Sequence, residues 1–222
     1  MFKKYVMNEM PVQINKDLVY KYKDVETATI GHIRQIGFAC PKIKPLIKNK
    51  TILGTAVTLA IPGQDSTLLH HIVGMLRKGD VLVIDRLGDH KHACIGGGVM
   101  CAIKASGCSG VIVDGAITDI NELLEYDIPI WSRGLSPITT RLYNIGGALN
   151  TPVSIGGAAV LPGYCVIADD SGVLFLPPDE AQNYAQWAKD YQGEEPASHE
   201  QILNKKVKLG EITGASELVE EK

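Results

Sequence analysis

Two apolar runs, joined by a glycine-led segment, constrain the fold of this chain more than any other feature. Residues 81–84 read Val-Leu-Val-Ile and residues 110–113 read Gly-Val-Ile-Val, with no polar side chain in either run. Such runs are typical of strands that are covered on both faces. A glycine triplet at 96–98 opens a helix expected at 98–106, which leads into the second run. We therefore expect an α/β domain built around a buried sheet.

Apolar spacing and turn residues predict the remaining elements. A Gly-Glu-Glu-Pro break at 193–196 is expected to separate the last two helices. With no repeat and no long linker, residues 1–222 are predicted to form a single domain with a β-rich second half and a helical tail. Further helices are expected at 16–22, 26–37, 67–77, 120–126, 179–191 and 198–209, and strands at 51–61, 128–131, 151–155, 159–161, 165–168 and 173–176.

Composition narrows the class of protein. The 222 residues are 45% hydrophobic and 21% charged, with a formal net charge of −3 and no basic block, which disfavours nucleic acid as a partner. No segment has the roughly 20 apolar residues of a membrane helix, so no membrane partner is expected. The early Glu9 argues against a signal peptide, and the five cysteines include no Cys-x-x-Cys pair. These features favour free thiols and a cytoplasmic location.

The glycine triplet is a candidate anion site. If Gly98 and Val99 begin the helix, their backbone N–H groups lack partners within it. A carboxylate or phosphate could bind there, helped by the helix dipole. The alternative is a plain structural turn. A phosphate-binding P-loop is excluded because no Gly-Lys-Ser/Thr follows the glycines.

Asp119 has two interpretations. Asp119 and Glu122 fit the spacing of a capping box, in which Asp119 caps the helix that follows. Alternatively, the Asp119 carboxylate could bind a hard cation beyond the end of the second buried strand. Asp114 ends that strand, where α/β sheets commonly place sites, or it stabilises the turn at Gly115.

Histidines near the glycines are further candidates. His90 and His92 could reach a metal if their loop is extended, and the alternative is a solvated loop. One of the pair His70-His71 could face the site from a helix flank. No nucleophile motif of the Gly-x-Ser-x-Gly type is found in the sequence.

Several short sequence motifs, which follow one another in a fixed order, give the chain a family resemblance. They lie at 54–58, 79–85, 110–116, 133–137, 152–153, 156–157, 162–163 and 168–173. In these motifs the chain resembles the ribonuclease E activity regulator A-like proteins, which include the class II 4-hydroxy-4-methyl-2-oxoglutarate and 4-carboxy-4-hydroxy-2-oxoadipate aldolases. The resemblance spans about residues 25–210.

The resemblance implies a fold, an assembly and a site. The fold would be a compact α/β domain like the swivelling phosphohistidine domain, assembled as a homotrimer or a hexamer of two trimers. Asp119 would bind Mg²⁺ or Mn²⁺, and the segment Gly96, Gly97, Gly98 and Val99 would receive a pyruvate-like 2-oxo acid. A C-terminal acid of the neighbouring subunit would complete the site, with Glu200 the first candidate and Glu195 the second.

Three departures from the family pattern alter the expected pocket. Thr118 stands where the aldolases have an arginine beside the keto oxygen, and one neutral hydroxyl replaces a permanent charge with several donors. Gly97 occupies a position that is often acidic, and Tyr164 replaces an aspartate. Arg86, Lys91 and Arg141 are candidates for a replacement cation, as is the loop that carries His90 and His92.

The leading hypothesis is a divalent-metal-dependent lyase that cleaves a small 2-oxo acid by retro-aldol reaction or decarboxylation and releases pyruvate or a similar product. Asp119 and Glu200 are the predicted catalytic residues, and Thr118 and His92 are predicted to contact the substrate along with the glycine segment. The alternatives are another metal-dependent enzyme, such as an isomerase, hydratase or hydrolase, and a non-catalytic, ring-shaped regulator of a ribonuclease.

Overall fold

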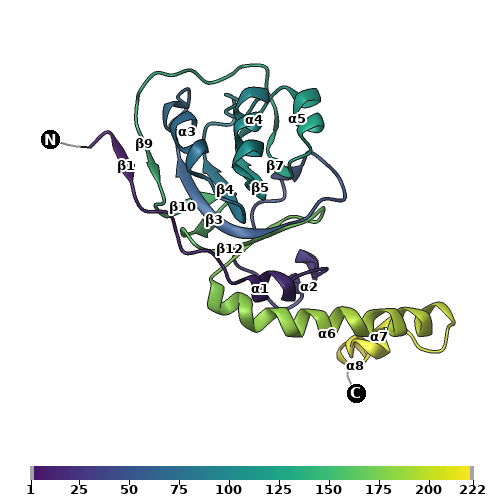
Figure 1. Ribbon diagram of the computed structural model, residues 1–222. Coiled ribbons are helices and arrows are strands. Elements are labelled where there is room, and N and C mark those ends of the chain that lie inside the picture. The colour runs from purple at the N-terminus through teal and green to yellow at the C-terminus, as the bar shows by residue number, and fades with distance from the viewer. Residues whose placement is uncertain (1–2, 221–222) are drawn as a thin grey trace.

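A nine-stranded mixed sheet organises the chain in a computed structural model that describes residues 3–220 (Figure 1). Its centre consists of four parallel strands in the order β3 (Ile52–Ala60), β4 (Asp80–Asp85), β5 (Gly110–Asp114) and β7 (Ile130–Ser132). All but the last residue of β4 and of β5 are buried, so the coverage predicted for the two apolar runs is confirmed.

Three helices cover one face of this sheet (Figure 1). They are α3 (Thr67–Ile72), which continues as a 3₁₀ turn at Val73–Met75, α4 (Gly97–Ser106) and α5 (Ile120–Tyr126). The helix α4 ends where Gly107 adopts a left-handed conformation with φ 75°, which a glycine takes at little cost. Side chains that pack between these helices and the sheet include Leu69, Ile72, Leu82, Met100, Ile103, Val111 and Leu123.

The other face of the sheet is covered by an antiparallel hairpin of β10 (Val153–Ile155) and β11 (Ala158–Val160). Its apolar residues pack against Val83 and Trp131 in a second core. A second hairpin, β12 (Cys165–Ala168) and β13 (Val173–Leu176), joins the sheet where β12 pairs antiparallel with the first half of β3. These four strands agree with the predicted β-rich second half.

Five short strands escape prediction from the sequence. Their own sequences show no alternation of apolar and polar side chains, and they form because a partner strand lies alongside. They are β1 (Tyr5–Met7), β2 (Lys44–Pro45), β6 (Ala116–Ile117), β8 (Gly134–Leu135) and β9 (Gly147–Leu149).

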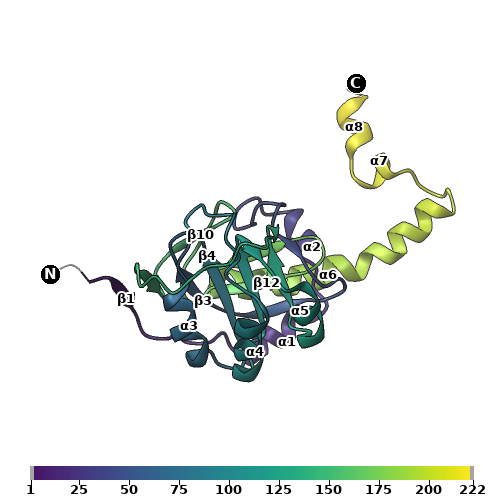
Figure 2. The ribbon, with the colours of Figure 1, turned by 90° about the horizontal axis from the view of Figure 1, so that it is seen from above.

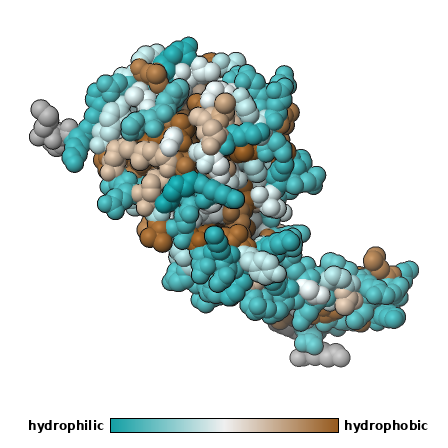
Figure 3. Space-filling view, viewed as in Figure 1, coloured by the Kyte–Doolittle hydropathy of each residue, from teal (hydrophilic) through white to brown (hydrophobic). Residues whose placement is uncertain are grey.

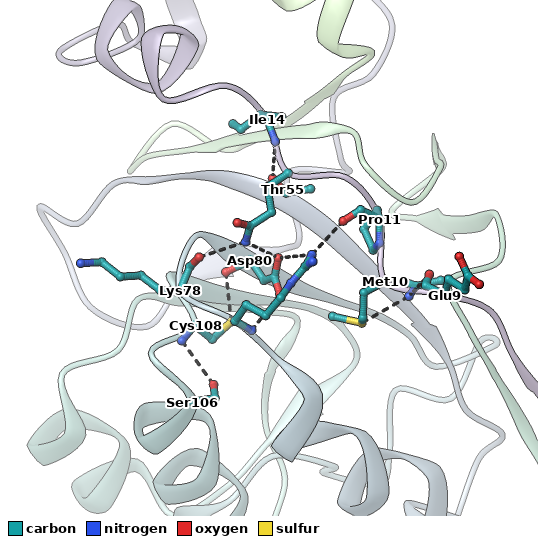
Figure 4. A network of polar contacts seen from close by, with 12 residues as sticks. Glu9, Met10, Pro11, Ile14, Thr55, Lys78, Asp80, Ser106 and Cys108 are labelled. Carbon is teal, nitrogen blue, oxygen red and sulfur yellow. Dashed lines mark hydrogen bonds and ion pairs between the residues drawn. The ribbon is translucent and has the colours of Figure 1, made fainter.

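A polar network fastens the N-terminal segment to the beginning of β4 (Figure 4). The fully buried Asp80 accepts hydrogen bonds from the backbone and side chain of Arg77, at 2.8 to 3.0 Å, and from Gln13 Nε2 at 2.8 Å. Arg77 in turn donates to the carbonyl of Pro11, and Ile14 N donates to Thr55 Oγ1. The network therefore holds residues 11–14 across the sheet.

The C-terminal tail differs from the prediction. Helix α6 (Pro178–Leu203) runs without a break through Pro196, so the interruption expected at 193–196 and the separate helix expected at 198–209 are wrong. Proline removes one helical hydrogen bond, but the helix here continues on both sides of it. Two short helices follow, α7 (Leu209–Ile212) and α8 (Ala215–Val219).

Only the first half of α6 packs on the body of the molecule. It contacts α1 (Lys16–Lys21) and α2 (Thr27–Gly31), and its buried residues are Ala181, Ala185 and Ala188. The second half of α6, α7 and α8 project from the body as an arm, which Figure 2 shows from above. The surface of this arm is mostly hydrophilic in Figure 3. Within residues 3–220, no helix has the length and apolar character needed to cross a membrane.

Helix α2 is shorter than predicted. It ends at Gly31 rather than at residue 37, because Ala39 N donates to Val173 O and the chain is drawn toward β13. Gly37 makes this turn with φ 90°, a conformation that favours glycine.

Candidate active site

Asp119 lies directly before α5, but its side chain does not cap that helix. It has left-handed backbone angles, φ 56° and ψ 47°, and makes no side-chain hydrogen bond to its own helix. N-cap residues that bind their own helix usually have extended backbone angles. The capping box predicted with Glu122 is therefore wrong. Asp119 Oδ2 instead accepts a hydrogen bond from Gly97 N at 3.0 Å, at the start of α4.

The glycines allow this close approach. A Cβ atom on Gly96 would overlap Asp119 Oδ2 and would lie 3.0 Å from Thr118 Cγ2. Asp119 Oδ1 contacts only the Thr118 hydroxyl, at 3.3 Å, among the residues that the structure describes. The Asp119 carboxylate thus sits over the glycine turn with one oxygen largely free for a ligand.

Two further donors lie beside this carboxylate. Gly98 and Val99 are the second and third residues of α4, whose N–H groups have no acceptor within a helix. Neither donates a hydrogen bond to any acceptor in residues 3–220. Because α4 is ten residues long, its dipole adds partial positive charge at this end. The start of α4 can therefore bind an anion next to Asp119.

A pocket of about 380 Å³ opens at this point. The start of α4, together with Thr118 and Asp119, lines part of it, and the segment 139–142 lines another part. Side chains from the start of α3 and from the loop before α4 complete it. The lining residues are Ser66, His70, Ala93, Cys94, Gly96, Gly98, Val99, Thr118, Asp119, Thr139, Thr140, Arg141 and Leu142.

Arg141 is the replacement cation that the structure brings into this pocket. Its Nη1 donates to Thr139 Oγ1 at 2.6 Å and to the carbonyls of Thr139 and Thr140 at 3.2 and 3.1 Å. Its backbone N–H donates to Gln64 O, and its carbonyl accepts from Ser66 N. These bonds hold the segment 139–142 against the start of α3. Arg141 has no acidic partner within residues 3–220. Arg141 therefore adds a permanent positive charge without an acidic partner to the residues that line the pocket.

Asp65 holds this segment in place. Its carboxylate accepts hydrogen bonds from the backbone and hydroxyl of Thr67 and from the backbone N–H groups of Tyr143 and Ile145, at 2.6 to 3.0 Å. Burial alone raises the pKa of Asp65, but these four hydrogen bonds outweigh it and lower the pKa to about 2. Asp65 is therefore ionised at neutral pH.

The other two candidate cations lie elsewhere. Arg86 is fully buried at the end of β4, where it donates to Gly63 O, and its Nε and Nη1 have no partner among the described residues. Lys91 is exposed. Neither of them lines the pocket.

Of the histidines, His70 lines the pocket and His92 does not. His92 Nδ1 lies 2.7 Å from Asp89 Oδ2. Burial opposes ionisation of Asp89, yet hydrogen bonds from His92 and Lys91 keep its pKa below the usual value. His90 lies 3.7 Å from Asp114, which also pairs with Arg133 and accepts from Gly156 N at 2.6 Å. Asp114 therefore has a structural role in this chain.

Cys94 also lines the pocket, but it is a poor nucleophile. Its thiol is buried, and burial raises its pKa to about 11. The thiol is therefore protonated at neutral pH.

The two C-terminal acids lie on the arm. Glu200 is exposed and Glu195 half-buried, both in the second half of α6, and neither lines the pocket of its own chain. Their expected place beside the pocket of a neighbouring subunit stays a prediction.

Sequence reasoning missed most of the pocket lining outside α4, Thr118 and Asp119. Ser66, Thr139 and Thr140 carry no motif of their own, and they meet α4 only through contacts between distant segments. The available signal was Arg141, which follows the Arg-Gly-Leu-Ser-Pro phrase at 133–137.

The donor set fits a magnesium-like cation. Mg²⁺ is commonly bound by one or two carboxylates and keeps its other positions for water and substrate oxygens. Asp119 offers one carboxylate in a space that a Cβ on Gly96 would fill. Within the described part of the chain, no group of three or more His, Cys, Asp or Glu side chains could hold a metal on its own. The arrangement thus suits a cation that binds together with a substrate.

Comparisons with known proteins identify the family. Residues 27–175 match the family model described as RraA-like, Aldolase/RraA. The chain belongs to the RraA-like family. A Halalkalibacterium halodurans protein named "Putative 4-hydroxy-4-methyl-2-oxoglutarate aldolase" is 30% identical over 191 residues, which cover 86% of this chain and 90% of that protein. An Arabidopsis thaliana protein with the same name and the number 3 is 30% identical over 134 residues, or 60% and 80% of the two chains.

A solved structure supports the RraA-like fold over most of the chain. Streptomyces coelicolor RraAS2, described as an unusual member of the RNase ES inhibitor RraA protein family, has a TM-score of 0.73 and 30% identity. The match covers 86% of this chain and 98% of RraAS2. The family model itself spans the whole pocket and ends before α6 begins.

Proposed function

We propose that this RraA-like protein is a divalent-metal-dependent lyase for a small 2-oxo acid that carries a second carboxylate. It cleaves the substrate by retro-aldol reaction or decarboxylation and releases pyruvate or a similar product. One observation carries the proposal: the Asp119 carboxylate and the free N–H groups of Gly98 and Val99 share one wall of a pocket. The names of the aldolase relatives agree with this chemistry.

Each residue has a role that follows from its position. The N–H groups of Gly98 and Val99 bind the substrate carboxylate next to the keto group, where the α4 dipole favours negative charge. Asp119 holds Mg²⁺ or Mn²⁺. When bound, the ion polarises the keto oxygen and stabilises the negative charge that develops on it. Because Gly97 N–H donates a hydrogen bond to Asp119 Oδ2, the carboxylate is held in one orientation for binding the cation.

Arg141 supports the choice of a substrate with two acid groups. Arg141 lines the same pocket as the start of α4, so a substrate with one carboxylate on α4 finds a second cationic group there for its other carboxylate. Thr118 contributes one neutral hydroxyl at the Asp119 end of the pocket. In this proposal Arg141 serves the second carboxylate, and the cation alone stabilises the charge on the keto oxygen.

The experiment compares the wild-type protein with Asp119→Asn. Pyruvate release is measured from 4-hydroxy-2-oxo diacids and from oxaloacetate, with added Mg²⁺ or Mn²⁺ and with a chelator. We expect activity that requires the metal, and a loss of about 10²-fold or more in Asp119→Asn, because a centre of charge stabilisation is removed. Absence of pyruvate from every substrate, or full activity of Asp119→Asn, would contradict the proposal.

A second candidate is a regulator of a ribonuclease. The similarity to RraAS2 favours it, since that protein is described as a member of an RNase ES inhibitor family. The test adds the purified protein to a ribonuclease E-type enzyme and measures RNA cleavage. Inhibition that Asp119→Asn retains would favour the regulator, because the pocket would not be needed for it.

A further inference from the structure

Two carboxylates, one from Asp119 just before α5 and one from Glu122 within it, meet at one residue of α4. Asp119 Oδ2 accepts from the N–H of Gly97, as described above. Glu122, in the first turn of α5, lies over the Cα side of the same residue. A Cβ atom on Gly97 would overlap Glu122 Oε2 and would lie 3.0 Å from Oε1. The space of a side chain at position 97 is thus filled by the Glu122 carboxylate.

The consequence is that glycine at position 97 leaves room for the Glu122 carboxylate beside the start of α4. The backbone angles of Gly97 are helical and need no glycine. The Gly97 Cα is itself buried. Glycine at this position keeps the space open for the neighbouring carboxylate, although the exposed and flexible Glu122 side chain would move aside for a Cβ atom.

We propose that Glu122 is the second carboxylate of the metal site and reaches it from α5 through the space left open at position 97. The inference rests on the proposed function, in which Asp119 binds the cation. Glu122 does not line the pocket, so it acts on the hydration shell of the cation and not on the substrate. It is a positioning residue. Groups of this kind typically change metal affinity by about 10- to 100-fold.

Charge favours this assignment. Two carboxylates at one helix start repel each other, and the positive end of α4 compensates only about half a charge. A divalent cation compensates both. Within residues 3–220, Glu122 has no basic partner that would explain its position.

The experiment measures Mn²⁺ binding to the full-length protein by electron paramagnetic resonance, without substrate. We expect Glu122→Gln to raise the Kd for Mn²⁺ by about 10- to 100-fold. Asp119→Asn should abolish binding. Glu125→Gln is the matched control, because Glu125 is an exposed acid on the same helix and should leave the Kd unchanged.

A swap of the two positions tests the geometry. The double variant Gly97→Glu with Glu122→Ala returns a carboxylate to the same space from α4, and we expect its Kd to fall back to near the wild-type value. Gly97→Ala alone should raise the Kd for Mn²⁺, because its Cβ takes the space of the Glu122 carboxylate. Circular dichroism checks that each variant is folded.

The outcomes separate the two proposals. An unchanged Kd in Glu122→Gln, with binding abolished in Asp119→Asn, would overturn the role of Glu122 and leave the proposed function standing. Unchanged Mn²⁺ binding in Asp119→Asn would remove the proposed metal site itself. A swap variant that binds Mn²⁺ no better than Glu122→Gln would also count against Glu122.

Discussion

Arg141 carries the permanent charge of the pocket, and only one side of its guanidinium is engaged. Nη1 is held by Thr139 and Thr140, while Nε and Nη2 donate to nothing within residues 3–220. A planar guanidinium can bind a carboxylate through two parallel hydrogen bonds, which a lysine cannot copy. We therefore expect Arg141→Lys to raise KM for the diacid by about tenfold and Arg141→Gln by about 10- to 100-fold.

Steady-state kinetics with two substrates checks this prediction. A 4-hydroxy-2-oxo acid without the second carboxylate should lose little when Arg141 is replaced, because it has no group to place against the guanidinium. An equal loss for both substrates would show that Arg141 acts on the common 2-oxo acid end instead.

Asp65 makes the stability of the fold depend on pH. Its pKa of about 2 in the folded protein lies below the ordinary value of 3.8, so its ionised form stabilises the fold. The contribution is complete above about pH 4 and is lost as pH falls through 2. The pKa difference corresponds to about 2 kcal/mol. Urea unfolding should show Asp65→Asn to be less stable at pH 7 by about this amount, and the gap should close near pH 2.

Asp119 shows what sequence reasoning could and could not predict about one residue. Its closeness to the glycine turn was predicted from the family resemblance, and its hydrogen bond to Gly97 agrees with that placement. The capping box with Glu122 was suggested by spacing alone. Spacing does not reveal that Asp119 takes left-handed backbone angles, which turn its side chain from α5 toward α4.

At the level of elements, β4 is anchored at its first residue. Its first residue, Asp80, is fully buried among Arg77, Gln13 and the N-terminal segment. Removal of the charge leaves the Arg77 guanidinium without its partner. The Arg77 side chain is 40% exposed, so water takes over part of the lost interaction. We expect Asp80→Asn to lower the free energy of unfolding by about 2 kcal/mol, measured by urea denaturation.

A control separates this anchor from an ordinary surface pair. Glu211 lies 4.0 Å from Lys208 on the arm, with both side chains exposed, and Glu211→Gln should leave the unfolding curve unchanged. Similar curves for Asp80→Asn and the wild type would contradict the role given to the network.

Helix α6 continues through two residues that usually interrupt a helix. Gly193 and Pro196 are both unfavourable inside a helix, and they predicted a break between two shorter helices. The structure keeps one helix through both residues. The proline lacks an N–H, so one helical hydrogen bond is lost, but the remaining turns on each side hold the direction of the chain.

For the whole molecule, the buried layers were predictable and the wall of the pocket was not. The apolar composition of runs such as 81–84 predicts that they are buried, and the spacing of apolar residues predicts the helices between the strands. The segment 139–145 has no periodic pattern. It reaches the pocket because the Asp65 carboxylate accepts hydrogen bonds from two of its backbone N–H groups. Asp65 is distant in sequence, so patterns of neighbouring residues do not predict this contact.

The arm exposes apolar side chains that its own chain does not cover. The second half of α6, α7 and α8 contain no buried residue, yet they expose several large apolar side chains. These are Leu203, Leu209, Ile212, Leu218 and Val219. Exposed apolar groups gathered on a projecting segment favour packing against another chain. The arm is thus suited to carry Glu200 to a neighbouring copy, as the trimer or hexamer predicted from the family resemblance requires.

A site shared between subunits can be tested by mixing two inactive variants. Asp119→Asn lacks the metal-binding carboxylate, and Glu200→Gln lacks the acid expected from the neighbour. If each site takes Asp119 from one subunit and Glu200 from the next, co-expression in equal amounts gives some sites with both acids. Random assembly of a ring with head-to-tail interfaces restores about one quarter of the wild-type activity. A mixture that is no more active than its separate variants would mean that Glu200 does not complete the site of another subunit.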